Sequence, residues 1–342
     1  MFNKLGVLNN IEYNFIPLNE NILVIQENAN ISFLGIYNSS LEQKKIIKDV
    51  TAYDFVQDEN NVVITNVNVN KSYVIDIFSY HLTELPYVLH LKGKKYGNKY
   101  LCHAEMDGKE YFLIISLINF DVIKKLDINI GFGNVQLWFD EIVISTRKRK
   151  GLLGVYDFNN TLLWQADVSQ LGSYTSSDGT HPGEINNIYY THEKVIVLTG
   201  LSVIAFSIND GSIVWHTKLD TWQSRGLLQQ QYLYTTSNAY INKIDINTGD
   251  IYYQREFDYV TINGRKDLGP VSEFVWHKNA IWSIMDTNPS TLIALNPEDG
   301  SFNYVIPLPE LGIKFDCQPP KFDGNRMYLL DFNHTLHIFE RE

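Results

Sequence analysis

One unit, residues 195–219, recurs along the chain and limits the possible folds more than any other feature. It reads VIVLTGLSVIAFSINDGSIVWHTKL, which is two β-branched apolar runs, a reversal at Asn209-Asp210-Gly211 and a third run. Asn, Asp and Gly tolerate the left-handed backbone that tight hairpin turns require. The third run alternates apolar and polar residues, with Ile213 and Trp215 on one face, as a half-buried strand does. The unit therefore predicts consecutive antiparallel strands.

The same unit can be found eight times. Its recurring strand is centred on residues that lie 37 to 54 positions apart, namely Val24, Val63, Leu101, Val143, Val197, Tyr234, Trp282 and Tyr328. A further short apolar segment precedes each of these strands, so each unit has four strands, here called a to d. Four-stranded units at a spacing near forty are typical of a β-propeller. We expect an all-β propeller of eight antiparallel blades, with seven as the alternative if one unit is degenerate.

The two ends of the chain complement each other. The last unit lacks its d strand, and the residues before Ile11 have no partner of their own. We predict that Met1–Leu8 pairs with Thr335–Glu340 and closes the ring, because an all-β repeat must protect its edges. Residues 1–342 are then expected to form a single propeller domain. No long segment with a 3.6-residue apolar period occurs, which disfavours a helical or doubly wound fold.

The net charge indicates which classes of partner the chain is expected to bind. The formal net charge is −11, from 39 acidic and 28 basic residues. An acidic surface repels nucleic acid and anionic membranes, so neither is expected, and a protein with a basic surface is favoured. The first fifteen residues contain no apolar core long enough for a signal peptide, and the longest apolar run is too short to span a bilayer. The expected location is the cytoplasm.

Residues 205–215, AFSINDGSIVW, resemble the repeat of the PQQ-like (quinoprotein alcohol dehydrogenase-like) propellers. Residues 243–253 and 294–304 look similar with Tyr in place of Trp, and Trp164 also fits; the resemblance covers residues 135–305. It implies that Trp164 and Trp215 dock between blades. The enzymes of that family bind the quinone beside calcium, often with a disulfide between adjacent cysteines. The two cysteines here, Cys102 and Cys317, are far apart, so the resemblance points to the non-catalytic, binding branch.

No strong catalytic motif is present. Gly131-Phe132-Gly133 begins like a dinucleotide loop, but Gln136 occupies the position of the third Gly. His334 and His337 have no ligand cluster in register and are interpreted as strand-end histidines. Asp286-Thr287-Asn288 lacks the other ligands of a calcium loop. We therefore expect no catalytic residue, no cofactor and no metal.

The lengths of the connections between strands indicate which face of the propeller binds a partner. The d-to-a and b-to-c connections emerge on one face, and this set contains the long segments 169–184, 258–270 and 308–317 as well as the basic turn 146–151. Long loops on a rigid scaffold are usually functional, although these could vary without any function. Aromatic and Arg side chains are the common interface anchors. The predicted partner-binding residues on this face are Tyr174, His181, Trp222, Arg225 and Arg265.

These observations favour a non-catalytic scaffold that binds another protein. A bacterial immunity protein that neutralises a toxin by masking it would fit an acidic propeller of this kind. The alternative is an enzyme, a hydrolase or lyase acting on a carbohydrate or small metabolite on the loop-rich face or in the central channel. Converging carboxylates or a metal in the channel would favour the enzyme.

Overall fold

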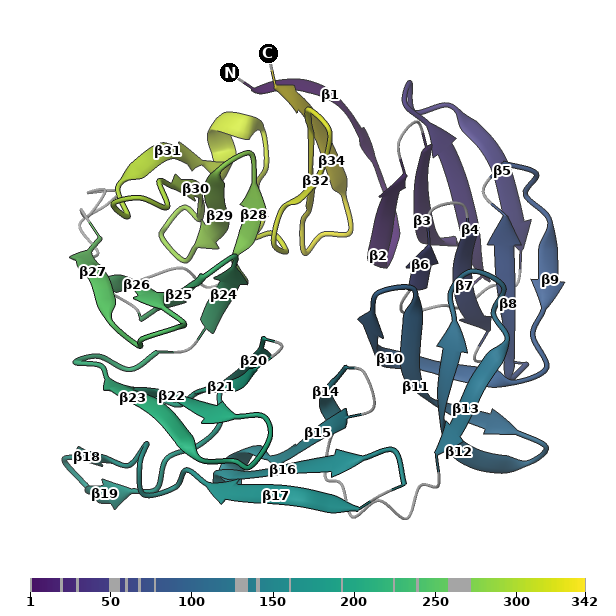
Figure 1. The fold of residues 1–342 in the computed structure, drawn as a ribbon. Helices are drawn as coiled ribbons and strands as arrows, with labels where there is room; N and C mark the ends of the chain where they lie inside the picture. The colour runs from purple at the N-terminus through teal and green to yellow at the C-terminus, as the bar shows by residue number, and fades with distance from the viewer. Residues whose placement is uncertain are drawn as a thin grey trace.

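The computed structural model describes residues 2–18, 21–28, 31–48, 56–58, 61–66, 69–76, 78–126, 135–139, 142–159, 161–191, 193–223, 225–237, 240–257 and 272–341. These residues form eight four-stranded antiparallel sheets arranged as a ring, with one additional two-stranded hairpin (Figure 1). The prediction of an eight-bladed propeller is confirmed, and the seven-bladed alternative is wrong.

The first four blades follow one another along the chain, each with its strands in the order a to d. Blade 1 comprises β2 (Ile11–Leu18), β3 (Asn21–Asn28), β4 (Ile31–Asn38) and β5 (Gln43–Lys48). Blade 2 comprises β6 (Val56–Asp58), β7 (Asn61–Asn66), β8 (Lys71–Asp76) and β9 (Leu82–Glu84). Blade 3 comprises β10 (Val88–Tyr96), β11 (Lys99–Met106), β12 (Lys109–Ser116) and β13 (Val122–Leu126). Blade 4 comprises β14 (Val135–Phe139), β15 (Ile142–Arg147), β16 (Leu152–Asp157) and β17 (Leu162–Asp167).

The second half repeats this order after the hairpin β18 (Tyr174–Ser176) and β19 (Gly179–His181). Blade 5 comprises β20 (Asn187–Tyr190), β21 (Lys194–Leu198), β22 (Ser202–Ser207) and β23 (Ile213–Lys218). Blade 6 comprises β24 (Arg225–Gln229), β25 (Tyr232–Thr236), β26 (Tyr240–Asp245) and β27 (Ile251–Glu256). Blade 7 comprises β28 (Val275–His277), β29 (Ala280–Met285), β30 (Thr291–Leu295) and β31 (Phe302–Pro307). Blade 8 comprises β32 (Lys321–Asp323), β33 (Arg326–Leu330), β34 (Leu336–Arg341) and β1 (Phe2–Leu8).

Helical structure in the described residues is confined to two short 3₁₀ turns, η1 (Lys148–Lys150) and η2 (Leu308–Leu311). Within the same residues, no helix has the length and the apolar character needed to cross a membrane.

The N-terminal strand closes the ring, as predicted. β1 runs antiparallel to β34, with Phe2 opposite Arg341 and Leu8 opposite Leu336. Figure 1 shows the two chain ends beside each other at this blade. The backbone N–H of Ile11 also donates to the carbonyl of His334, 2.9 Å away, which ties blade 1 to blade 8. The two ends of the chain thus share one sheet and its hydrogen bonds.

The apolar side chains are buried between blades. One core cluster contains Ile196 and Trp215 of blade 5 together with Leu233 and Ile244 of blade 6. Another joins blades 8 and 1. Each blade therefore buries its face on its neighbour, so the propeller needs no single central core.

The predicted docking of tryptophans between blades is confirmed. Trp164 of β17 donates its indole N–H to the carbonyl of Ile208 in blade 5, 2.7 Å away. Trp215 of β23 makes the equivalent hydrogen bond to Ile246 in blade 6, at 3.0 Å. The turn glycine of the next blade lies over each indole in both cases, with a positive φ. The Trp and the Gly of neighbouring repeats are thus two halves of one contact.

Candidate functional site

Four of the five predicted contact residues lie in the described residues, and all four belong to d-to-a connections or their ends. Tyr174 and His181 form the hairpin β18–β19 inside the longest connection, between blades 4 and 5. Trp222 lies in the connection from β23 to β24, and Arg225 begins β24. Arg265, with the rest of the connection 258–270, lies outside the described residues.

Three of these side chains contact one another and form the aromatic patch, defined as Tyr174, His181 and Trp222. Tyr174 and His181 are opposite each other in the hairpin and stack with ring centroids 5.0 Å apart. The Trp222 indole meets Tyr174 edge-on at 4.7 Å and is 39% exposed. Figure 1 shows the hairpin at the outer margin of the ring, next to blades 4 and 5. The patch is therefore an accessible cluster of aromatic rings built from two separate connections.

Close backbone packing holds the hairpin of the aromatic patch in place. Gly172 and Gly183 donate backbone hydrogen bonds to Val168 and Ser169, at 2.9 and 2.7 Å. A Cβ on Gly183 would come within 2.6 Å of the Gly172 backbone, so this approach requires glycine. The Ser202 hydroxyl of blade 5 donates to the carbonyl of Leu171. The long connection is thus anchored to the ring at several points.

Gln223 anchors the other half of the aromatic patch. Its side chain is fully buried, and its backbone N–H donates to the carbonyl of Gly200 at 2.6 Å. The Gln223 side-chain oxygen accepts from the amide of Asn242, and its backbone carbonyl accepts from the side chain of Asn186. A buried polar side chain with its hydrogen bonds made favours one conformation of its segment. This network fixes Trp222, which packs directly over Gly200.

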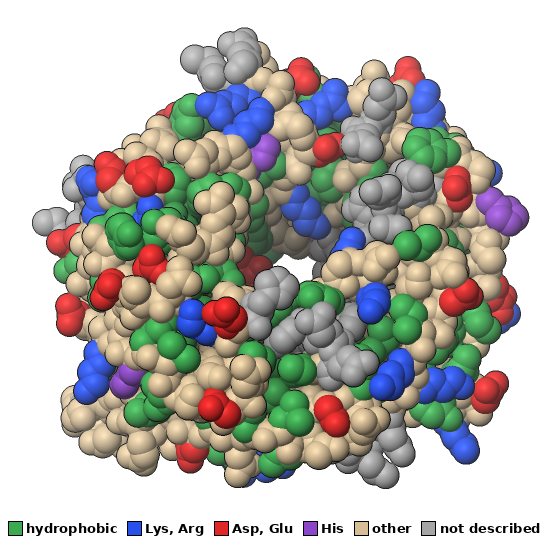
Figure 2. Space-filling model, viewed as in Figure 1, with side chains coloured by type: hydrophobic (Ala, Val, Ile, Leu, Met, Phe, Trp, Pro, Cys, Tyr) green, Lys and Arg blue, Asp and Glu red, His purple; other side chains and the backbone are tan. Residues whose placement is uncertain are grey.

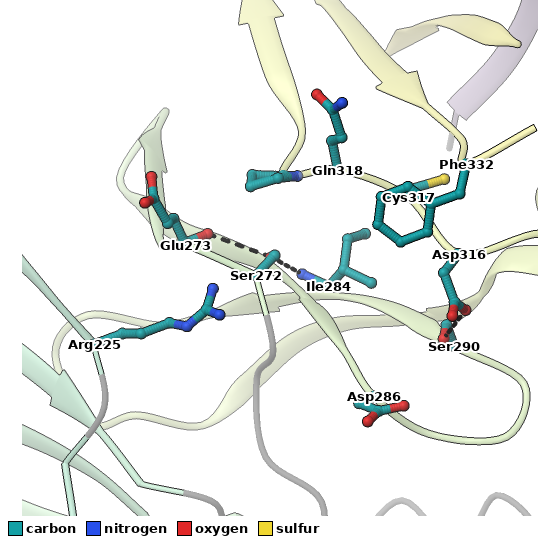
Figure 3. Close-up of a pocket in the computed structure, with 11 residues that line it drawn as sticks. Arg225, Ser272, Glu273, Ile284, Asp286, Ser290, Asp316, Cys317, Gln318 and Phe332 are labelled. Atoms are coloured by element: carbon teal, nitrogen blue, oxygen red, sulfur yellow. Dashed lines mark hydrogen bonds between the residues drawn. The ribbon is translucent and has the colours of Figure 1, made fainter. Parts of the chain in front are cut away.

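A pocket of about 580 Å³ lies beside Arg225, in blades 6 to 8 (Figure 3). Its walls come from the start of β24, the segment before β28, the β29–β30 connection, the segment before β32 and the β33–β34 connection. These are again d-to-a and b-to-c connections, so the pocket and the aromatic patch belong to the same loop-rich face. Its volume is within the range of small-molecule sites.

Carboxylates and one guanidinium determine the chemistry of this pocket. Glu273, Asp286 and Asp316 line it together with Arg225. Figure 3 shows Glu273 on the side nearer Arg225, and Asp316 on the opposite side, where it accepts a hydrogen bond from Ser290. The carboxylates are therefore spread around the pocket rather than paired. Three carboxylates against one guanidinium favour a cationic group as its occupant.

Cys317, which also lines the pocket, is not activated as a nucleophile. Burial raises the pKa of its thiol, and the carboxylates of Asp331 and Asp316 raise it further. A reactive cysteine requires the opposite shift, toward the thiolate. The apolar ring of Phe332, 65% exposed, lies near Cys317 at the pocket wall. The arrangement is suited to holding a side chain or a small ligand rather than to covalent catalysis.

The two histidines interpreted as strand-end residues have structural partners. His337 is buried with its Nε2 2.8 Å from the Asp331 carboxylate, and its pKa is lowered, chiefly by burial and also by the charge of Lys4, although Asp331 acts to raise it. His334 holds its Nδ1 2.9 Å from the carbonyl of Ile11, at the closure of the ring. The Gly131-Phe132-Gly133 segment lies outside the described residues.

Neither Gln223 nor the pocket carboxylates were among the site residues predicted from the sequence. Glu273, Asp286 and Asp316 are separated by 13 and 30 residues and have no recognisable spacing. Only the order of the connections around the ring could have suggested that they share a pocket. Gln223 follows Trp222 directly, but nothing in its type indicates burial.

Eight antiparallel blades closed by a shared terminal sheet place the chain in the β-propeller class of folds. It is similar to BamB from Moraxella catarrhalis, with a TM-score of 0.58 and 10% identity over 100% of both chains. It also matches the Pan2 WD40 domain of Neurospora crassa, with a TM-score of 0.46 and 9% identity over 99% of this chain and 95% of that one. A KlHsv2 variant whose loop 6CD is replaced by a Gly-Ser linker matches with a TM-score of 0.47 and 12% identity, over 84% and 94%. At these identities the likeness shows the fold alone. No protein-family model and no curated protein sequence matches the chain.

Proposed function

We propose that this propeller binds another protein on its loop-rich face, with the aromatic patch as the anchor. The observation that carries the proposal is the mutual contact of Tyr174, His181 and Trp222, from two connections, on a backbone held by hydrogen bonds. Rigid, partly exposed aromatic side chains lose little conformational entropy on binding and are the commonest hot spots of interfaces. The patch therefore has the composition and the preorganisation of a docking site.

The partner in this proposal has a basic surface. The chain has a formal net charge of −11, and the pocket beside Arg225 carries three carboxylates. Figure 2 shows acidic and basic side chains interspersed around the central opening on the face in view. We infer that the propeller attracts its partner through its overall negative charge and through the pocket, which would receive a Lys or Arg side chain of the partner.

The proposal also covers the family branch, the kind of partner and the cellular compartment. The Trp docking at Ile208 and Ile246 supports a place among the PQQ-like propellers, and the absence of adjacent cysteines supports their non-catalytic branch. The charge supports a toxin masked by an immunity protein as the kind of partner. Two free, buried cysteines, Cys102 and Cys317, suit a reducing compartment such as the cytoplasm.

A small molecule bound in the pocket is the second candidate function, because a volume of about 580 Å³ is ample for one. An enzyme acting on a carbohydrate or small metabolite would use this pocket rather than the aromatic patch. Structures solved after soaking with candidate ligands would separate the two functions.

Replacing both Tyr174 and Trp222 by alanine is expected to weaken partner binding about a thousandfold, because each interface anchor contributes about 2 kcal/mol or more. The partner is first captured from the native cell with the wild-type propeller and identified by mass spectrometry. Its affinity is then measured by calorimetry for wild type and variant. Both side chains are partly exposed, so the melting temperature of the variant should change little.

A matched control removes exposed apolar side chains from the opposite face. Phe78 and Ile118 lie in c-to-d turns and are 67% and 64% exposed. The Phe78→Ala/Ile118→Ala variant should bind the partner like wild type. Loss of binding in this variant alone would place the site on the opposite face. Full binding in both variants would leave the pocket as the better candidate.

Neutralising pocket carboxylates is expected to slow association with the partner, because long-range attraction acts on the encounter, and to speed dissociation, because a cationic side chain held in the pocket loses its direct partners. The Glu273→Gln/Asp286→Asn variant is compared with wild type in stopped-flow mixing at low and high salt. The wild-type association rate should fall as salt rises, and the rates should converge at high salt. The control is Glu193→Gln/Asp250→Asn, which removes two exposed carboxylates from the other face. Equal effects of the two double variants would contradict a local role of the pocket.

A further inference from the structure

Two histidines and a glutamate converge on blade 3, away from the aromatic patch and the pocket. His90 of β10, His103 of β11 and Glu110 of β12 offer ligand atoms that all lie within 4.8 Å of one another. His90 and Glu110 are exposed and His103 is half-buried. No metal site was expected from the sequence, and these three residues, which were not among the candidates, are separated by 13 and 7 positions and match no metal-binding spacing.

Strand register brings the three side chains together. His90 is directly opposite His103 in the β10–β11 pair. His103 is opposite Phe112 in the β11–β12 pair, so Glu110 is its diagonal neighbour toward the Asp107-Gly108 turn. Directly opposite and diagonal residues on one face of a sheet are within reach of each other's side chains. Three adjacent strands thus present two imidazoles and one carboxylate to the same space.

One pair of ligand atoms already has a separation that suits a shared ion. The Nε2 of His103 lies 3.5 Å from Oε2 of Glu110. This is longer than a normal hydrogen bond between nitrogen and oxygen, which spans 2.7–3.2 Å. Two ligands bound to one tetrahedral Zn²⁺ at 2.0–2.1 Å lie about 3.3 Å apart. The pair is therefore close to the spacing that a shared zinc ion imposes.

Packing holds the central ligand in place. The His103 ring lies against His90 with centroids 4.8 Å apart and against Phe112 with centroids 5.6 Å apart. Leu101, two residues before His103 on β11, belongs to the core cluster shared with Val143 of blade 4. His103, backed by the core and by Phe112, needs little rearrangement to bind an ion, whereas the exposed His90 ring turns out of its stack on His103 and exposed Glu110 adjusts toward the ion.

We propose that His90, His103 and Glu110 form a site for a divalent transition-metal ion, with Zn²⁺ as the expected occupant. Imidazole nitrogen and carboxylate oxygen are common zinc ligands, whereas Ca²⁺ and Mg²⁺ prefer oxygen alone. Three protein ligands leave one position of a tetrahedral ion open to water or to an outside ligand. The site shares no residue with the proposed partner-binding face, so the two proposals stand or fall separately.

Calorimetric titration with ZnCl₂ on the full chain, after removal of any affinity tag, tests this site. Wild type is expected to bind one Zn²⁺ with a micromolar or lower dissociation constant, and CaCl₂ should give no binding. His90→Ala, His103→Ala and Glu110→Gln should each weaken Zn²⁺ binding by more than about 100-fold, because even groups that only orient metal ligands contribute 10–100-fold. Co²⁺ bound to wild type should show visible d–d absorption, and this absorption should be absent from the variants.

His181→Ala is the matched control, since His181 is also a partly exposed histidine next to a carboxylate, with Asp178 at 3.1 Å. This variant should bind Zn²⁺ like wild type. Circular dichroism and melting curves show whether each variant folds. Glu110→Gln should fold even if a histidine variant does not, because Glu110 is exposed next to a turn, so it keeps the test valid. Wild-type binding weaker than millimolar would overturn the proposal, as would Glu110→Gln binding as tightly as wild type.

Discussion

Deleting residues 2–9 is expected to lower the melting temperature sharply and to leave a large fraction of the protein unfolded. These residues supply β1, the outer strand of blade 8, which pairs with β34 from Phe2 to Leu8. The deletion removes the buried side chain of Leu8 and the edge-on contact of Phe2 with Trp282, at 5.7 Å. Fully burying one such side chain contributes about 1.5–3 kcal/mol, so losing buried Leu8 and partly buried Phe2 removes a large part of a total stability of about 5–15 kcal/mol.

The lost strand has a second consequence. β34 would expose its backbone groups as a free edge, which favours pairing with other molecules. The truncated protein should therefore aggregate as well as melt early, and light scattering together with thermal denaturation measures both. Leu5→Ser is the control, because Leu5 is 42% exposed and lies at the irregularity of the β1–β34 pairing. If the truncated and full-length chains melted together, β1 would contribute nothing to closure.

The repeat made the fold predictable from sequence. Strand period, turn residues and the spacing of anchors such as Val197 and Tyr234 all depend on local pattern, and each signal recurs from unit to unit. Closure was predictable too, because a last unit with three strands needs a fourth. These inferences require only that neighbouring repeats pack alike.

The candidate site was predictable only in part. Tyr174, His181 and Trp222 could be assigned to surface connections from sequence. Their mutual contact, however, depends on how two connections meet, since Trp222 lies 48 residues after Tyr174 and 41 residues after His181. Predicting that the pocket carboxylates share one pocket requires the order of the blades, and predicting the His90–His103 contact requires the register of the strands. Residue type alone carries neither kind of information, since carboxylates and histidines are frequent on any surface.

Trp215→Ala is expected to cost about 3–5 kcal/mol, the usual range for removing a buried large aromatic side chain. The Trp215 indole is buried in the cluster between blades 5 and 6 and donates to the carbonyl of Ile246 at 3.0 Å. Truncation leaves both a cavity and a buried carbonyl without its donor, and the second effect adds to the first. Trp215→Phe should lose less, because it keeps most of the apolar contact and gives up the hydrogen bond.

Gly249 is the residue of blade 6 that the Trp215 ring contacts. Gly249 of blade 6 has φ +81°, and a Cβ placed on it would come within 2.8 Å of the Trp215 ring. The indole therefore fills a space that the next blade leaves for it by using glycine, which ties the stability of one blade to the turn of the next.

Exposed neighbours on the same strand provide the control for the Trp215 experiment. Ile213 and Val214 are 50% and 46% exposed, so Ile213→Ala and Val214→Ala should change the free energy of unfolding by no more than about 0.5 kcal/mol. Urea denaturation followed by fluorescence and by circular dichroism gives the unfolding free energies of all four variants. A Trp215→Ala protein that unfolds like wild type but no longer binds its partner would show that the indole acts in recognition. Because the indole is covered by blade 6, we expect the opposite result, a loss of stability in which partner binding weakens only as the folded fraction falls.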